Sequence, residues 1–323
     1  MNTRSQLHHI LLSILIIFTI QIQCHANIAS THAQSEISYS LNEYKQAVYK
    51  TVLDKKIQVQ LLVDTGSPVN MIAASLVKSL GLVPRPATAT NGTPLELEGS
   101  PATAVNVRST QIGRFNLTEQ LFLIMSDKRL HELCGKDVDG VIRLNTLQTF
   151  NIIFNFSKNS LLFIYPAGLS SEDINELSFR RSEKISIYQS PSNLLYFTKV
   201  SLFNATDCIE HDMILDSGSY YTILPKEDAN KLHLQNKIST LKVKPAGGKQ
   251  TLGMDKVTSI RLGNYECLEH HIMFNMENES QNAIVGFSED LFGGHRVLID
   301  FKNNAMYVVS EAPITIKQMP DSK

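Results

Sequence analysis

The chain has 323 residues and a formal net charge of −1 at pH 7. Its 30 Lys and Arg residues balance 31 Asp and Glu residues and gather in no sustained basic stretch, which argues against a nucleic-acid-binding surface. The length is sufficient for two domains of ordinary size.

The first 26 residues have the composition of a secretory signal peptide. Arg4 gives a short positive region, residues 10–20 form an apolar run, and Ala26 is a small residue where cleavage is expected. The run is too short to span a bilayer comfortably, so an uncleaved anchor is the lesser alternative, and no later segment is apolar enough to cross. We therefore expect an exported protein, periplasmic or secreted, whose mature chain begins with a polar lead over residues 27–43.

The first informative element is a strand that ends in an acidic turn. Apolar residues alternate with polar ones over residues 57–63, which predicts a half-buried strand, preceded by a strand over residues 44–49 and a turn at residues 53–56. The strand leads directly into Asp64-Thr65-Gly66-Ser67. A short helix is expected over residues 73–81, because Gly81 suits the position just past a helix end.

The same arrangement returns 152 residues later, since 216 − 64 = 152. Apolar residues 213–215 lead into Asp216-Ser217-Gly218-Ser219, and residues 225–233 again indicate a short helix. A hairpin that turns at residues 204–207 is expected before this second motif. Asp-Ser/Thr-Gly alone is ordinary turn chemistry, but two copies in matching surroundings indicate a duplicated chain.

Later features recur in the same order with a shorter offset. Gly113 and Gly263 each stand in a turn before an apolar strand, and Val141-Ile142 matches Ile284-Val285. Each copy then closes with two β-rich strands. The predicted organisation is a first repeat over residues 44–166, a polar linker over 167–193, a second repeat over 194–310 and a tail over 311–323.

Two such loops facing each other would place the carboxylates of Asp64 and Asp216 around one water. Close carboxylates cannot both ionise easily, so they share one proton and supply a base and an acid near the same pH. This is the equipment for hydrolysis of an amide bond without a cofactor, and we expect an acidic pH optimum.

The remaining motif residues would support the two acids. The glycines let the backbone pass close behind each acid and donate N–H groups. The first hydroxyl residue of each motif would tie the loops together, and the second would hydrogen-bond an outer carboxylate oxygen. The supporting residues are Thr65, Gly66, Ser67, Ser217, Gly218 and Ser219.

Both motifs, with the apolar pairs that follow them, resemble those of the retropepsin-like and pepsin-like aspartic peptidases. The resemblance covers both repeats and implies a mostly β, bilobal fold with the active site in a cleft between related halves. It implies Asp64 and Asp216 as the catalytic acids and a polypeptide substrate bound extended under a hairpin flap. The repeat size favours two fused retropepsin-like units, and hence a monomer. Candidate flaps carry the turn dipeptides Asn91-Gly92 and Gly247-Gly248.

The sequence departs from the family pattern in the first repeat. Arg143 stands after Val141-Ile142 where the family has Gly, whereas the second repeat keeps Gly286. No Tyr lies between Gly81 and Phe115, so the flap tyrosine typical of pepsins is missing. Arg143 either points to solvent or reports an altered first site, and the sequence leaves both interpretations open.

Other functions fit the sequence less well than an aspartic endopeptidase. A non-catalytic peptide- or protein-binding module with the same fold is the alternative that Arg143 favours. Nucleophilic catalysis by Ser or Cys lacks a placed His partner. A metal site would have to use Glu266, Cys267, Glu269, His270 and His271. Because adjacent His residues on a strand point to opposite faces, a solvated strand is the better interpretation.

Three cysteines remain after signal removal: Cys134, Cys208 and Cys267. The odd number leaves at least one free thiol or one intermolecular bond. A bond between Cys208 and Cys267 is conceivable within the second repeat, but the sequence does not show that they come close enough.

Overall fold

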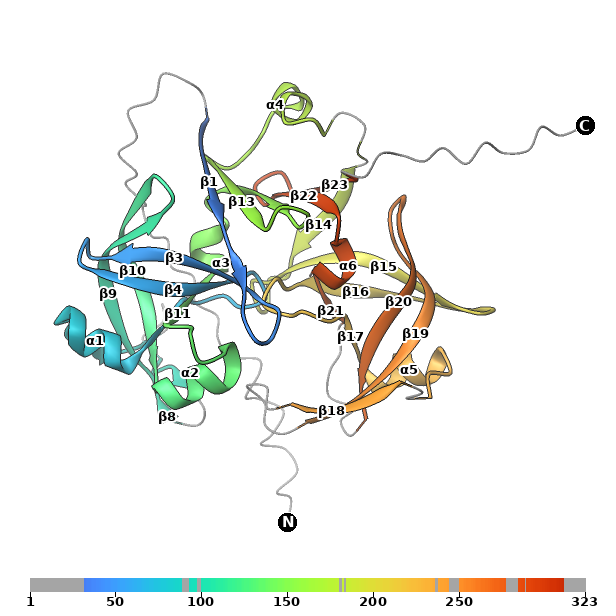
Figure 1. Cartoon of the computed structure of the whole chain (residues 1–323), viewed down its shortest axis with the longest axis horizontal. Helices are drawn as coiled ribbons and strands as arrows, with labels where there is room; N and C mark the ends of the chain where they lie inside the picture. Colours follow the sequence, from blue (N-terminus) through green and yellow to red (C-terminus); the bar gives the residue numbers. More distant parts are fainter. Residues whose placement is uncertain are drawn as a thin grey trace, which may run out of the picture.

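A computed structural model of the chain describes residues 32–88, 93–97, 100–179, 182, 184–235, 238–243, 250–276, 284–287 and 289–310. The structure is mostly β, with two lobes that share a sheet, the first lobe on the left of Figure 1 and the second on the right. The mostly β, bilobal fold predicted from the sequence is confirmed. The expected signal peptide and C-terminal tail lie outside the described residues.

The first lobe is a closed barrel. Its strands, in spatial order, are β3 (Ala47–Leu53), β4 (Ile57–Asp64), β11 (Gly140–Arg143), β5 (Met71–Ala73), β10 (Phe115–Met125) and β9 (Thr103–Ile112). Pairing of β3 with β9 closes the ring. The short strands β2 (Ser40–Leu41) and β6 (Arg85–Pro86) extend it, and β7 (Glu96–Leu97) pairs with β8 (Ser100–Pro101).

The second lobe repeats this order strand for strand. Its strands are β15 (Tyr196–Asn204), β16 (Asp207–Leu215), β21 (Ile284–Gly286), β17 (Ile223–Leu224), β20 (Tyr265–Asn275) and β19 (Gln250–Leu262). Pairing of β15 with β19 closes this barrel, and β18 (Ser239–Val243) adds to β19. The matching order confirms the internal duplication.

A sheet built from both halves joins the lobes. Its order is β1 (Ala33–Ser38), β13 (Ser160–Tyr165), β12 (Asn151–Asn155), β22 (His295–Asp300), β23 (Ala305–Ser310) and β14 (Lys184–Gln189). The antiparallel pair of β12 and β22 lies at its centre, with Ile153 opposite Leu298. Phe154 and Phe156 from the first half contact Phe287 from the second. These aromatic contacts add specific packing across the boundary between the halves.

The segments outside the two expected repeats also contribute to this sheet. The polar lead supplies β1, which pairs with β13, and the expected linker supplies helix α4 (Ser171–Glu176) and then β14. β1 is an edge strand, whereas β14 also pairs with β15 and so connects the joining sheet to the second barrel; both alternate between exposed and more buried residues. Each half therefore contributes three strands to the joining sheet.

Short helices follow the motifs as predicted. Helix α1 (Ala74–Leu80) ends at Gly81, whose φ of 65° is the left-handed conformation that glycine adopts without strain. Helix α5 (Lys226–Lys231) has Pro225 at its N-cap. The remaining helices are α2 (Asp127–Cys134), α3 (Leu144–Leu147) and α6 (Glu289–Phe292).

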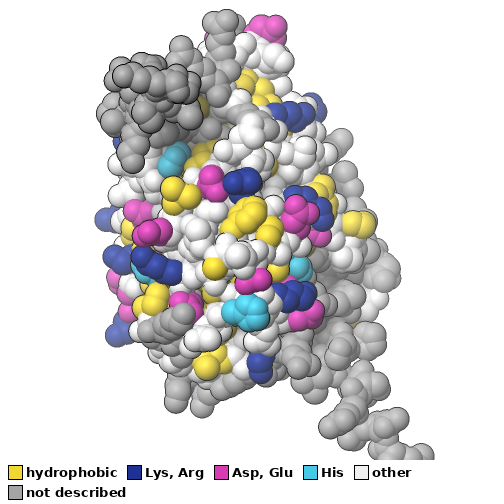
Figure 2. All heavy atoms as spheres, turned by 90° about the vertical axis from the view of Figure 1, so that its right-hand side faces the viewer, with side chains coloured by type: hydrophobic (Ala, Val, Ile, Leu, Met, Phe, Trp, Pro, Cys, Tyr) yellow, Lys and Arg dark blue, Asp and Glu magenta, His cyan; other side chains and the backbone are white. Residues whose placement is uncertain are grey.

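The surface over the second lobe carries charges of both signs. Figure 2 shows Lys and Arg side chains interspersed with Asp and Glu on this face, with neither sign gathered into a broad patch. Among the described residues, no helix has the length and apolar character that a membrane crossing requires.

Candidate active site

Each motif acid lies at the end of a central strand of its lobe. The last four residues of β4 are buried, so this strand brings Asp64 to the edge of the core. Strand β16 ends at Leu215, directly before Asp216. β4 runs parallel to β11 and β16 runs parallel to β21, which places the second apolar signature of each copy beside its acidic loop.

The register of these parallel pairs corrects the sequence alignment by one residue. Val141 lies between Leu62 and Met71, and Val285 lies between their counterparts Ile214 and Ile223. Val141 therefore corresponds to Val285, and not to Ile284 as the sequence suggested. Two residues further along each strand, Arg143 corresponds to Phe287, which is buried and follows Gly286.

The two motif loops are tied together across the lobes by their first hydroxyl residues. The Thr65 Oγ1 atom donates to the Leu215 carbonyl at 2.7 Å and accepts the Ser217 N–H at 3.0 Å. Reciprocally, Ser217 Oγ donates to the Val63 carbonyl at 3.0 Å and accepts the Thr65 N–H at 3.1 Å. Both residues are buried, so these hydrogen bonds are shielded from water. The arrangement matches the role expected for these two hydroxyls.

The glycines bring the acids face to face. Gly66 N–H donates to Asp64 Oδ1 at 2.8 Å, and Gly218 N–H donates to Asp216 Oδ1 at 2.9 Å. A Cβ atom on Gly66 would overlap the Asp216 carboxyl group, and one on Gly218 would lie 2.9 Å from Cγ of Asp64. Each loop thus lies against the acid of the other lobe, and only glycine leaves room for this approach.

The pKa of Asp216 is raised well above its usual value. Burial is the largest cause, followed by the charge of Asp64 and a hydrogen bond with it. The Gly218 N–H group and the Arg143 charge act in the opposite direction but are outweighed. The surroundings therefore favour the neutral form of Asp216.

Arg143 points to the first acid and not to solvent. Its Nε lies 3.2 Å from Asp64 Oδ2, and its Nη1 donates to the Ser67 hydroxyl. Its backbone N–H donates to Asn70 Oδ1 at 2.8 Å, and its side chain is 12% exposed. Arg143 and Asn70 are site residues that the sequence did not assign. The pairing of Arg143 with Asp64 in the β11–β4 register explains the contact.

The second hydroxyl residues of the motifs bond elsewhere than expected. Ser67 accepts a hydrogen bond from Arg143, whose guanidinium lies beside the outer oxygen of Asp64. Ser219 donates to the Tyr221 carbonyl at 2.9 Å. In the first lobe an ionic contact therefore occupies the place where a hydroxyl contact was expected.

A buried polar cluster supports each motif from behind. In the first lobe, Asn70 Nδ2 donates to Thr146 Oγ1 at 2.9 Å, and Thr146 Oγ1 donates to Gln120 Oε1 at 2.8 Å. In the second lobe, His270 Nε2 lies 3.2 Å from Thr222 Oγ1 and 3.1 Å from Asp290 Oδ2. The β-strand register aligns Gln120 with His270, so the second cluster is the ionisable version of the first.

His270 carries a positive charge over a wide pH range. Burial opposes the charge, but hydrogen bonds and charges from Asp290 and Cys267 outweigh it and raise the pKa of His270 to about 9. His270 is 4% exposed, which corrects the expectation that this residue lies on a solvated strand. The sequence carried a signal for this difference, because adjacent side chains on a strand point to opposite faces. In the structure His271 is the exposed residue and His270 the buried one.

The two glutamates of the conceivable metal site form surface ion pairs. Glu266 pairs with Arg261, and Glu269 pairs with Lys256. Within the described part of the chain, no group of His, Cys, Asp and Glu residues is arranged to hold a metal ion. Cys134, Cys208 and Cys267 are all free, so the conceivable Cys208–Cys267 bond is not formed.

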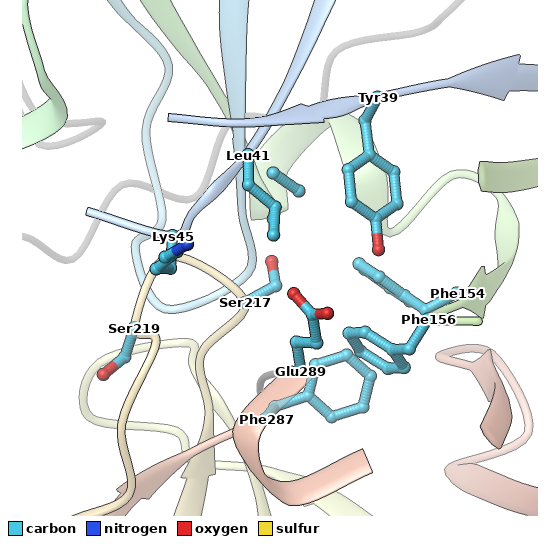
Figure 3. A pocket seen from close by; sticks show the side chains of 10 residues that line it. Tyr39, Leu41, Lys45, Phe154, Phe156, Ser217, Ser219, Phe287 and Glu289 are labelled. Carbon is cyan, nitrogen blue, oxygen red and sulfur yellow. The ribbon is translucent and has the colours of Figure 1, made fainter. Parts of the chain in front are cut away.

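A small hollow lies beside the second motif loop. In Figure 3 the Tyr39 hydroxyl points into it from above and the Glu289 carboxylate from below, with Phe154 and Phe156 at the right. Burial, and then the Glu289 charge, raise the pKa of Tyr39. Ser217 and Ser219 line the hollow, whereas neither Asp64 nor Asp216 does. The hollow is therefore not the place where a substrate would meet the acids.

The candidate flap residues Asn91, Gly92, Gly247 and Gly248 lie outside the described residues. A different segment, the turn before β3, contacts the second motif loop. There Gln46 Nε2 donates to the Gly218 carbonyl at 2.6 Å.

Comparison with solved structures shows the fold in other proteins. Basic 7S globulin from soybean is 9% identical, with a TM-score of 0.51 over 85% of this chain and 94% of that one. Conglutin gamma, a basic 7S globulin from lupine seeds, is 12% identical, with a TM-score of 0.51 over 87% and 95%. A retropepsin-like aspartic protease from Rickettsia conorii is 14% identical, with a TM-score of 0.31 over 43% and 97%. A search of curated protein sequences gives no significant match.

Comparison with protein-family models gives one match in each half of the chain. A model described as "Aspartyl protease" matches residues 50–145, which include the first motif and Arg143. A model described as "gag-polyprotein putative aspartyl protease" matches residues 207–288, which include the second motif. The chain therefore belongs to the retropepsin-like aspartyl protease family and carries one such domain in each half.

Proposed function

We propose that the protein is an aspartic endopeptidase that hydrolyses peptide bonds with Asp64 and Asp216. The observation that supports this most is the meeting of the two acids, each lying against the motif glycine of the other lobe. The raised pKa of Asp216 adds the required difference in protonation between two chemically identical groups.

In the proposed reaction, ionised Asp64 takes a proton from a water molecule placed between the acids. The resulting hydroxide attacks the peptide carbonyl carbon while neutral Asp216 gives its proton to the carbonyl oxygen. The tetrahedral intermediate then collapses, and the amine leaves with a proton returned from the dyad. The interlobe hydrogen bonds of Thr65 and Ser217 hold the loops in the geometry that this transfer needs.

Turnover of an unfolded protein, such as reduced and alkylated casein, tests the proposal. We expect Asp64→Asn and Asp216→Asn each to lower kcat by about 10³-fold or more, because each removes a proton-transfer group. Asp207→Asn is the matched control, since Asp207 is the first residue of β16, at the opposite end of the strand from Asp216, and its carboxylate lies 3.9 Å from the exposed His233. Equal activity of all four proteins would contradict the assignment of the dyad.

Binding of peptides without cleavage is the second candidate function, and the Arg143–Asp64 ion pair is the observation that favours it. A cation on the base could withdraw it from catalysis. In that case the protein would retain a peptide ligand in equilibrium binding while the turnover assay showed no product at any pH from 3 to 8.

We further propose that one exported chain suffices for activity and binds its polypeptide substrate in an extended form. Both motif loops come from the same chain, which supports a monomer. N-terminal sequencing and light scattering of the exported protein test these points. We expect a chain that begins at Asn27 and has the mass of a monomer.

A further inference from the structure

Arg143 is held in a defined position by both its backbone and its side chain. The N–H group donates to Asn70, the guanidinium donates to Ser67, and Nε lies 3.2 Å from Asp64 Oδ2. The side chains of Arg143 and Asp64 are 12% and 10% exposed. A pair this buried is screened little by salt, so its electrostatic effect is larger than that of a surface ion pair.

The two acids are therefore unequally provided with positive charge. The position that corresponds to Arg143 in the second lobe holds Phe287, whose ring packs against Phe154 and Phe292. Among the described residues, no ion pair joins Asp216 to a cation. A guanidinium beside a carboxylate favours its charged form, whereas a second carboxylate disfavours it.

We propose that Arg143 is a positioning residue that keeps Asp64 as the ionised base of the dyad and leaves Asp216 as the proton donor. The proposal deepens the proposed peptidase function and rests on it for its kinetic consequence. In this proposal the two acids do not share the proton equally: Asp216 holds it and Asp64 is the base. It also extends the working range of the dyad to more acidic conditions, because the ion pair opposes protonation of the base.

Few other ionisable groups face this pair. Asp216 approaches from the second lobe, and Cys134 approaches from α2, where its electrostatic interactions with Arg143 and Asp64 have opposite signs. Burial raises the pKa of Cys134 to about 12, so its thiol stays neutral across the range in which an acid protease works. The remaining contacts, from Gly66, Ser67 and Asn70, are uncharged. Arg143 is thus the group whose charge can bias the dyad.

The pH dependence of kcat/KM for wild type and Arg143→Met tests the kinetic consequence. We expect the acid limb of the variant to move up by roughly 1 pH unit or more, because the carboxylate loses its cation. Arg143→Lys, which keeps the charge, should return the acid limb at least part of the way to its wild-type pH. Arg261→Met removes one cation from the surface of the second lobe and should leave the profile unchanged.

Two kinetic outcomes would overturn the proposal. A uniform loss of rate with unchanged limbs would mean that Arg143 only supports the fold. A uniform gain of rate with unchanged limbs would mean that it blocks the site. If the Met variant does not fold, Arg143→Gln, which keeps a polar side chain but removes the charge, takes its place.

A second measurement is independent of turnover. In protein labelled with carboxyl-13C aspartate, the dyad signals are assigned from Asp64→Asn and Asp216→Asn and followed by NMR from pH 2 to 8. We expect the first protonation of the dyad at higher pH in Arg143→Met than in wild type. An unchanged titration would refute the inference even in an active enzyme. A shifted titration without turnover would preserve the inference and refute the proposed peptidase function.

Discussion

Asp64 and Asp216 occupy equivalent loops, yet their neighbours give them different properties. Arg143 contacts the first acid, whereas the second faces the first acid and Gly66. At the residue scale, the two identical acids are therefore distinguished by Arg143, which stands in the first lobe at the position that Phe287 holds in the second. The same loss of a negative charge should affect the two positions in opposite ways.

We predict that Asp216→Asn stabilises the protein at neutral pH and that Asp64→Asn destabilises it. Because the folded-state pKa of Asp216 is raised, folding opposes its ionisation, and this cost grows as pH rises above the unfolded value. Removing the carboxylate should therefore raise the free energy of unfolding at pH 7. Asp64→Asn leaves the buried Arg143 without its carboxylate, which should cost roughly 3 kcal/mol.

Urea unfolding at pH 7 measures both effects. The stabilisation by Asp216→Asn should disappear at pH 3, where the wild-type carboxyl group is neutral in both states. Destabilisation by Asp216→Asn at pH 7 would contradict the assignment of a neutral, partly buried acid.

At the scale of elements, corresponding strands of the two barrels have the same backbone geometry but different side chains at an equivalent buried position. β10 and β20 each contain a glutamate with positive φ, 52° at Glu119 and 50° at Glu269, and the next residue is buried. That residue is Gln120 in the first lobe and His270 in the second. The second lobe therefore has a pH-dependent support where the first has a neutral one.

We predict that this histidine makes the second lobe more stable in acid than in alkali. Its folded pKa, about 9, is above the usual 6.5, so the stabilisation is complete below pH 6.5 and is lost as pH rises through 9. The change should be on the order of 3 kcal/mol, by conversion of the pKa difference. His270→Gln, which copies the first lobe, should remove this part of the dependence.

Chemical unfolding of wild type and His270→Gln at intervals from pH 6 to 10 provides the comparison. His271→Gln is the matched control, because His271 is the exposed neighbour on the same strand. Parallel pH dependences in wild type and His270→Gln would show that His270 carries no charge in the folded state.

The sequence was sufficient for the elements whose pattern is local. The motif strands, the helices after them and the interlobe role of Thr65 and Ser217 follow from alternation, turn residues and duplication. The orientation of the Arg143 side chain could not be predicted from the sequence. It depends on the register between β11 and β4, which are far apart in the chain. Strands β1 and β14 were also missed, since their pairing partners, and not their own polar residues, make them strands.

At the scale of the whole molecule, the joining sheet fixes one lobe against the other. β12 and β22 pair at its centre, and aromatic residues from both halves pack beside it. A dyad with one acid from each lobe needs this fixed arrangement, because a displacement of about 1 Å can cost 10²-fold in rate. Duplication and fusion thus place within one chain a site that has contributions from two domains.

The double variant Asp64→Asn/Asp216→Asn provides the most direct test that the two lobes form one catalytic site. Residues that act as a unit are strongly non-additive, so removing both should cost little more than removing either. We predict that kcat of the double variant lies within about 10-fold of the weaker single variant. A double loss equal to the product of the two single losses would contradict a shared dyad.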